Sequence, residues 1–350
     1  MKKCIYLKGT EPQLMFKSGE HIIPAGLGGI MKLQTGLVSD QVNTQIFSPL
    51  ELDFMRNSHI SLPRQFYGPG KRGSLATEKA SKSNVHIMES RDDGSRCLGY
   101  IKLGKPCSIP QFRVGLDEIV HFNFDKADGT PEIQLYNFSK SLKKFDGIYH
   151  EINDKRIPED EYILGIDNAK WFLAKNPTRQ IPDLLKAVGK IIGSIDDDTK
   201  VEPQFQTTQI TSHQSFEINM DGFFRVCAKI VFNFLALSKG QDFVLLEEFD
   251  PIRNWILNGG ENKFVQPIDK NSQLDFLVQI PFPELSHKII IAKVKNSLIG
   301  IISFYGTNFE AIIQLTDNMV AKDFYLDGFI CDWKNKKEYR FLEFINSLSD

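Results

Sequence analysis

The sequence has few cysteines, little net charge and no long hydrophobic run. Its five cysteines are scattered over 350 residues without a CxxC pair, so a disulfide-stabilised fold is not expected. The formal net charge of −2 excludes the strong basic excess of many nucleic-acid-binding domains. The most apolar stretch, residues 223–237, is interrupted by Arg225, Lys229 and Asn233, whereas a membrane span needs about 20 apolar residues. We therefore expect a cytoplasmic protein without a membrane segment.

The residues that are present predict an α+β fold. Apolar residues make up 41% of the chain and charged residues 25%, which is typical of globular domains. Periodicity and capping residues predict helices at residues 49–55, 183–192, 221–239 and 251–258. Short β-like runs between turn residues predict strands at residues 98–103, 111–114, 118–124, 132–136, 288–295, 298–305 and 311–315.

The chain divides by composition into a small head and a larger body. A polar, glycine- and serine-rich stretch suggests a domain at residues 1–75, a linker at 76–96 and an α+β domain at 97–350. That last domain can be divided further, into 97–215 and 216–350. Residues 1–80 carry a net charge of +4, which leaves −6 on the rest. A modestly basic head hints at a polyanionic partner.

One short region combines residues that suit phosphodiester cleavage. Glu20 can ligate a hard cation such as Mg²⁺ or Mn²⁺, and His21 can take a proton from water near neutral pH. Asn43 can fix the imidazole tautomer, and Glu51 can return a second carboxylate to the metal from a short helix. The alternatives are a surface Glu-His pair, a turn asparagine, and a first-turn acid favoured by the helix dipole.

These residues resemble HNH endonucleases of the ββα-metal class. The match runs over Glu20-His21-Ile22-Ile23-Pro24-Ala25-Gly26-Leu27-Gly28-Gly29, then Asn43 and Glu51. The resemblance implies a small ββα-metal domain at residues 1–75, with His21 as general base and Asn43 orienting it. It also implies Glu20 and Glu51 as metal ligands, Mg²⁺ as cofactor and DNA as substrate. Restriction, phage defence or a mobile element is the implied setting.

The sequence lacks the cysteine pairs that would form a structural zinc site. Cys4, Leu7, Ser39 and Val42 stand where family members often carry two CxxC pairs, and one cysteine cannot form a tetrahedral zinc site. We expect no structural zinc, with Leu7 and Val42 packing where the metal would lie. The lost ligands also support an alternative function, a catalytically inactive nucleic-acid-binding or regulatory protein.

Basic residues downstream of the motif suit a DNA-facing loop. Arg64, Lys71 and Arg72 lie among proline, glycine and Tyr67 and can contact phosphates, although solvated loop charges explain them equally well. His59 is expected to be a surface histidine rather than a spare ligand. The C-terminal domain is expected to choose the target, to sense a signal, or to mediate oligomerisation or partner binding.

Overall fold

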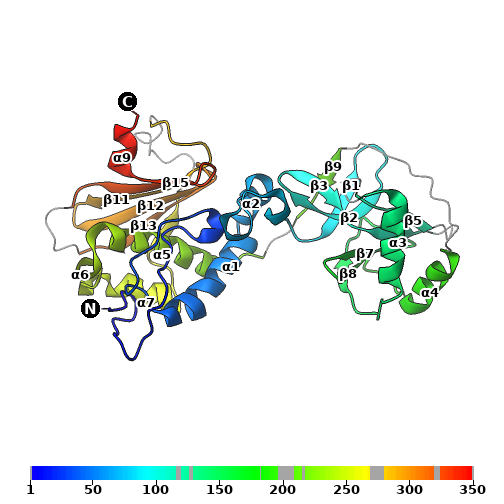
Figure 1. Cartoon of the computed structure of the whole chain (residues 1–350), viewed down its shortest axis with the longest axis horizontal. Coiled ribbons are helices and arrows are strands. Elements are labelled where there is room, and N and C mark those ends of the chain that lie inside the picture. Colours follow the sequence, from blue (N-terminus) through cyan, green and yellow to red (C-terminus); the bar gives the residue numbers. More distant parts are fainter. Residues whose placement is uncertain are drawn as a thin grey trace. The chain divides into compact units, whose positions relative to one another are not determined.

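The chain folds into two compact units (Figure 1). Unit 1 comprises residues 1–81 and 216–350, and unit 2 comprises residues 82–215. Both units mix helices and strands, which confirms the predicted α+β class. The computed structural model describes residues 2–115, 120–125, 129–181, 183–195, 209–214, 217–268, 280–318 and 324–348.

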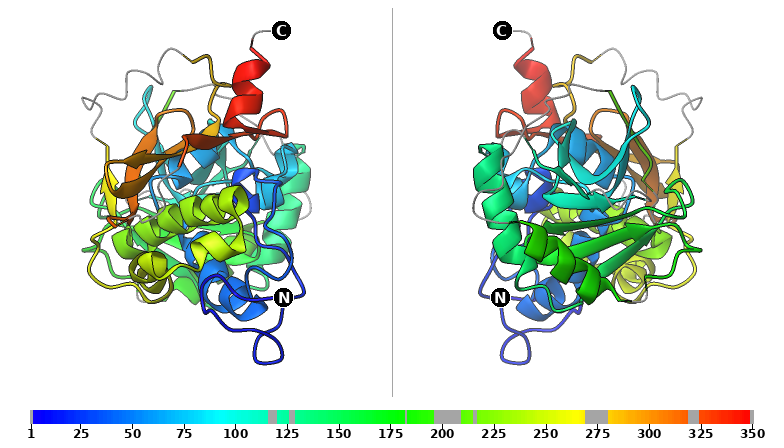
Figure 2. Two further views of the ribbon diagram at one scale, coloured as in Figure 1. Left: turned by 90° about the vertical axis from the view of Figure 1, so that its left-hand side faces the viewer. Right: turned by 90° about the vertical axis from the view of Figure 1, so that its right-hand side faces the viewer.

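Unit 1 is built on a six-stranded antiparallel sheet with the strand order β10-β13-β12-β11-β14-β15. The strands span Val265–Pro267 (β10), His287–Val294 (β11), Ser297–Phe304 (β12), Phe309–Thr316 (β13), Asp327–Asp332 (β14) and Lys337–Arg340 (β15). One face is covered by Met220–Lys239 (α5), with Gln241–Val244 (α6) and Asp250–Asn258 (α7), and the other by Phe341–Asn346 (α9) (Figures 1 and 2). The predicted helix 221–239 and the strands at 288–315 are confirmed.

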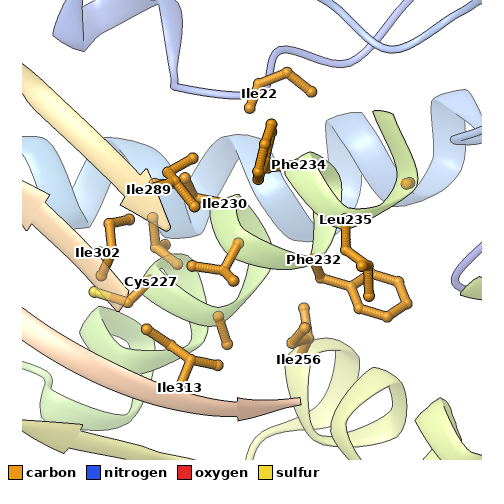
Figure 3. Packing of buried hydrophobic residues seen from close by; sticks show 14 of the residues in the cluster. Ile22, Cys227, Ile230, Phe232, Phe234, Leu235, Ile256, Ile289, Ile302 and Ile313 are labelled. Carbon is orange, nitrogen blue, oxygen red and sulfur yellow. The ribbon is translucent and has the colours of Figure 1, made fainter. Parts of the chain in front are cut away.

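Strand β11 shows why its sequence is apolar without alternation. Side chains alternate between the faces of a strand, so Ile289 and Ile291 join the core beneath α5, while Ile290 joins a second cluster with Phe341 of α9. Helix α5 lies so close to the sheet that a Cβ on Gly300 would stand 2.2 Å from a methyl carbon of Val231. Figure 3 shows this core, with Cys227, Ile230 and Phe234 of α5 facing Ile289, Ile302 and Ile313.

The N-terminal residues complete the same core. A π-helix at Val42–Phe47 runs directly into Ser48–Arg56 (α1), and a short helix follows at Ser61–Tyr67 (α2). The rings of Phe54 in α1 and Phe223 in α5 stack at 4.9 Å between centroids. Ile22 of the motif also reaches the cluster around α5 (Figure 3). The N-terminal segment and the C-terminal sheet therefore share one hydrophobic core.

Unit 2 contains two sheets and its own apolar clusters. The first sheet has the order β3-β2-β1-β9, from His86–Ser90 (β1), Arg96–Lys102 (β2), Lys105–Ser108 (β3) and Ile210–Ser212 (β9). The second has the order β5-β4-β7-β8-β6, from Gln111–Val114 (β4), Val120–Asn123 (β5), His150–Asn153 (β6), Tyr162–Asp167 (β7) and Lys170–Lys175 (β8). Pro131–Leu142 (α3) and Leu184–Ser194 (α4) pack with the second sheet around Phe112, Phe138 and Trp171.

The structure divides the chain differently from the sequence-based division at 1–75, 76–96 and 97–350. Residues 1–81 belong with 216–350 because their apolar side chains share the core around α5. Residues 76–96 do not form the expected linker over their whole length, because they include strand β1 and the first residue of β2. The expected internal boundary between 215 and 216 coincides with the second crossing between the units.

One predicted strand is wrong. Residues 132–136 lie in α3, which begins with Pro131 at the first helical position after Thr130. Proline is favoured there because its fixed φ suits a helix and its missing N–H is not needed. Among the described residues, no helix combines the length and the apolar character that crossing a membrane requires.

Candidate active site

The motif residues lie on a short antiparallel pairing. The N–H of Ile22 donates to the carbonyl of Met31 at 3.0 Å, and the N–H of Leu33 donates to the carbonyl of Glu20 at 2.7 Å. His21 therefore lies directly opposite Lys32. Because opposed residues of an antiparallel pair project to the same face, the exposed Lys32 is a cross-strand neighbour of the imidazole.

The two predicted metal-ligating carboxylates converge on one lysine of α5. Lys229 Nζ donates to Glu51 Oε1 at 2.5 Å and also to Glu20 Oε1. Lys229 and Glu20 are buried, and the Glu51 side chain retains 18% of its accessible surface. The ring of Phe47 lies 5.2 Å from the same ammonium. The sequence identified both carboxylates and missed the cation that joins them.

Glu20, Glu51 and Lys229 form a triad in which the two carboxylates and the buried ammonium compensate one another's charge. Burial by itself lowers the pKa of Lys229, but the attraction of Glu20 and Glu51 outweighs it and raises the pKa above its ordinary value. The lysine is therefore charged at neutral pH. Removing one partner of a buried ion pair typically costs about 3–5 kcal/mol, because the remaining charge is left unpaired. We expect the position of Glu20 to depend on Lys229.

The His21 side chain is partly buried beside this triad. Burial, followed by the nearby charges of Lys32 and Lys229, lowers its pKa to about 4, against a smaller opposing effect of Glu51. The imidazole is therefore neutral at pH 7 and able to accept a proton. The backbone is fixed from α5, since Asn233 Nδ2 donates to the carbonyl of His21 at 3.0 Å.

A tyrosine completes the hydrogen-bond chain behind His21. The hydroxyl of Tyr6 donates to Asn233 Oδ1 at 2.8 Å, which leaves the amide nitrogen of Asn233 to donate to His21. Asn233 is fully buried, and a buried amide needs partners on both its oxygen and its nitrogen. Lys229 and Asn233, one helical turn apart, therefore hold Glu20 and His21 respectively.

Asn43 lies near the start of the helical run but is not joined to His21 in the described contacts. Its carbonyl accepts from Ser48 Oγ at 3.0 Å, while its side chain makes no hydrogen bond to the imidazole among the described residues. It lies in the π-helix at Val42–Phe47, a form that is frequent at functional sites. The expected role of Asn43 in fixing the tautomer stays a prediction.

The four positions at which the HNH resemblance predicts lost zinc ligands differ in burial. Cys4, Ser39 and Val42 are buried, whereas Leu7 is 44% exposed. Val42 therefore packs as expected, but the expected packing of Leu7 is wrong. Within the described part of the chain, no three His, Cys, Asp or Glu side chains are grouped so that they could hold a metal ion.

A divalent cation on Glu20 and Glu51 does not fit the donors as they lie. Each carboxylate offers an oxygen to Lys229, so an added ion would share the space with a buried ammonium. Like charges this close repel strongly where water is excluded. The two carboxylates expected to bind Mg²⁺ are therefore present, but Lys229 already compensates their charge.

The predicted DNA-binding residues differ in accessibility. Arg64 is buried, and its Nη1 donates to the carbonyl of Met55 at 2.7 Å, so its expected phosphate contact is wrong. The guanidinium instead ties α2 to the end of α1. Lys71 and Arg72 are exposed and accessible to a ligand, and His59 is a surface histidine as expected.

Two residues of the C-terminal sheet hydrogen-bond to the backbone at residues 27–31. The Glu338 carboxylate accepts from the N–H groups of Ile30 at 2.9 Å and Met31 at 2.5 Å. His287 Nδ1 accepts from the N–H of Tyr305 at 3.2 Å, so its Nε2 donates to the carbonyl of Leu27 at 3.1 Å. Both contacts fix backbone between Glu20 and Lys32.

Sequence reasoning missed Lys229, Asn233, Lys32, Glu338 and His287. A usable indication existed for the first two, since with Arg225 they are polar residues spaced four apart in the most apolar stretch of the chain. Such residues lie on one helix face and need partners if the helix is buried. Comparison with protein-family models, with curated proteins and with solved structures finds no significant match to this chain.

Proposed function

We propose that this protein is an HNH-like endonuclease that hydrolyses DNA phosphodiester bonds with His21 as general base. The observation that carries the proposal is the convergence of Glu20, His21 and Glu51 in one partly buried cluster. Glu51 comes from a separate helix, yet its charge acts on the imidazole. A histidine whose pKa is perturbed by burial and by nearby charges is a candidate catalytic residue.

The chemistry follows from the exposed side of the cluster. The neutral His21 removes a proton from water as the water oxygen attacks phosphorus. The bond from phosphorus to the 3′ oxygen then breaks, solvent protonates the leaving oxygen, and the imidazolium returns its proton to solvent. Lys32 lies beside the base and would contact the scissile phosphate. Lys71 and Arg72 are exposed enough to bind flanking phosphates.

Nicking of supercoiled plasmid tests the proposal. We expect His21→Ala to lose about 10²–10⁴-fold of the activity, the usual contribution of a general base. His59→Ala is the matched control, because it removes an exposed histidine of the same unit and should nick at the wild-type rate. The assay is run with Mg²⁺, with Mn²⁺ and with EDTA.

The outcomes separate the base assignment from the activity. If His21→Ala nicks as fast as wild type, His21 is not the base. If wild type leaves the plasmid intact under all three conditions, the endonuclease proposal fails.

A second candidate function is a catalytically inactive nucleic-acid-binding or regulatory protein. The pairing of both carboxylates with Lys229 favours it, because such pairing is also how a chain stabilises a site that has lost its metal. This candidate predicts a gel shift with DNA that falls steeply with added salt, without nicking under any metal condition. Nicking that depends on His21 would contradict it.

A further inference from the structure

Lys229 joins three separate parts of the chain through one charged atom. Glu20 is the first residue of the motif at 20–29, Glu51 lies in the first turn of α1, and Lys229 lies in the middle of α5. In sequence, Glu20 lies 209 positions from Lys229 and Glu51 lies 178 positions from it. Holding carboxylates from distant segments around one cation is the task that a bound metal performs in many sites.

The lysine is fixed in this position by its surroundings. Its neighbours on α5, Ala228 and Ile230, are fully buried, so the helix cannot turn to release it without exposing the core. The Phe47 ring lies 5.2 Å from the ammonium, and the side chain retains only 2% of its accessible surface. An exposed lysine exchanges partners with solvent, whereas this ammonium is shielded from solvent in the folded state.

The hydrogen bonds of Lys229 also identify Glu20 and Glu51 as its partners in the folded protein. An ammonium donates up to three hydrogen bonds, and Lys229 directs two of them to the two carboxylates. One turn further along α5, Asn233 holds the His21 carbonyl. The same helix face therefore positions Glu20 through its side chain and His21 through its backbone.

We propose that Lys229 is the resident cation of this site and holds Glu20 and Glu51 in place of a divalent metal ion. Lys229 is then a positioning residue, since it is buried and acts through the carboxylates and His21. The inference rests on the proposed function only in treating the cluster as catalytic. Its content, that the site assembles without metal, is independent of whether DNA is cleaved.

Metal titration of the full-length protein tests the inference. We expect wild type to show no stoichiometric binding of Mg²⁺ or Mn²⁺ by calorimetry. Its unfolding midpoint should be the same in EDTA and in millimolar metal. One equivalent of bound metal that is lost in Glu51→Gln would overturn the inference, because that metal would occupy the position assigned to the ammonium.

Lys229→Met removes the charge and keeps an unbranched side chain. We expect its unfolding midpoint to fall by roughly 5–15 °C, as for a buried ion pair that loses one partner. Mn²⁺ should then restore part of the loss by binding the two unpaired carboxylates. A variant with the wild-type midpoint, or one that Mn²⁺ does not stabilise, contradicts the inference.

Lys288→Met is the matched control. It removes a partly buried lysine of β11 and should gain no response to Mn²⁺. If Lys229→Met is not recovered in folded form, the titrations of wild type and Glu51→Gln decide the matter alone.

Nicking assays on the same preparations separate the two proposals. Nicking in EDTA that requires His21 supports both. Nicking that appears only when metal binds at Glu51 contradicts the resident cation and leaves the endonuclease standing. Absence of both nicking and metal binding contradicts the endonuclease and leaves the resident cation standing.

Discussion

At the scale of single residues, the site is held by a few buried polar groups whose partners are far away in sequence. Lys229 and Asn233 each satisfy groups of the Glu20-His21 dipeptide, and Glu338 satisfies the N–H groups of Ile30 and Met31. A buried polar group without a partner costs about 1–3 kcal/mol. Each of these contacts therefore fixes the motif as well as stabilising the fold.

His287 gives a prediction about pH. It is fully buried, and burial lowers its pKa to about 3, below the ordinary value of about 6.5. As the pH falls below 6.5, the unfolded chain binds a proton that the folded chain does not. Stability is therefore complete above pH 6.5 and is lost as the pH falls toward 3, at up to about 1.4 kcal/mol per pH unit.

The measurement compares wild type with His287→Gln by urea unfolding between pH 7 and pH 4. A Trp171→Phe background leaves the tryptophans of unit 1 as the fluorescence reporters. We expect His287→Gln to be less stable at pH 7 but to lose stability less steeply on acidification. His59→Gln, which changes an exposed histidine, should keep the wild-type slope. An unchanged slope in His287→Gln would show that this residue does not cause the acid sensitivity.

At the scale of elements, the motif turn depends on glycines for two different reasons. Gly28 has a φ of +92°, which L side chains rarely adopt, and it packs against Trp333. Gly29 has no such φ but lies so close to Ile23 that a Cβ would stand 1.9 Å from its carbonyl oxygen. The double glycine of the motif is therefore required by backbone conformation at one position and by space at the next.

Gly29→Ala and Gly26→Ala form a matched pair. A Cβ on Gly26 would meet Met55 Sδ at 2.2 Å, and this flexible side chain can move away, whereas the Ile23 backbone cannot. We expect Gly29→Ala to cost about 3 kcal/mol or more, the upper end for overpacking, and Gly26→Ala to cost about 1 kcal/mol. Thermal unfolding checks the order, and equal losses would place the constraint elsewhere in the turn.

The helix that carries Asn43 and Glu51 shows how an element alters a spacing argument. Eight residues make about 2.2 turns of an α-helix, which leaves the two side chains on different faces. The π-helical segment at Val42–Phe47 turns less per residue, so it reduces this difference. No local pattern in the sequence announced that segment.

At the scale of the whole molecule, the chain leaves unit 1 after residue 81 and returns to it at residue 216. The N-terminal segment buries Ile22, Phe47 and Phe54 against α5 of the C-terminal part. The region that resembles HNH endonucleases therefore contributes to the core of unit 1 and does not form a separate domain.

Expression of fragments tests this organisation. We expect residues 1–75 alone to give the circular dichroism of an unfolded chain, because their apolar side chains lose the partners on α5. Residues 82–215 should fold and melt cooperatively, since their clusters are formed within unit 2. A folded 1–75 fragment with dispersed amide resonances would contradict the shared core.

Much of the local structure could be predicted, and the errors have identifiable causes. The helix at 221–239 and the strands at 288–315 follow from apolar periodicity and turn residues. Residues 132–136 form a helix in place of the expected strand, because Pro131 begins α3 directly before them. The accessibility of Arg64 could not be predicted, because it depends on the packing of α1 against α2.

The sequence by itself determined the α+β class, the long apolar helix and the carboxylate and histidine residues of the candidate site. Such features depend on neighbours within a few positions, through periodicity, capping and the chemistry of each side chain. Only the tertiary structure decided which cation pairs Glu20 and Glu51, and which part of the chain completes the N-terminal core. These contacts join residues 178 and 209 positions apart, so they are set by the packing of the whole unit.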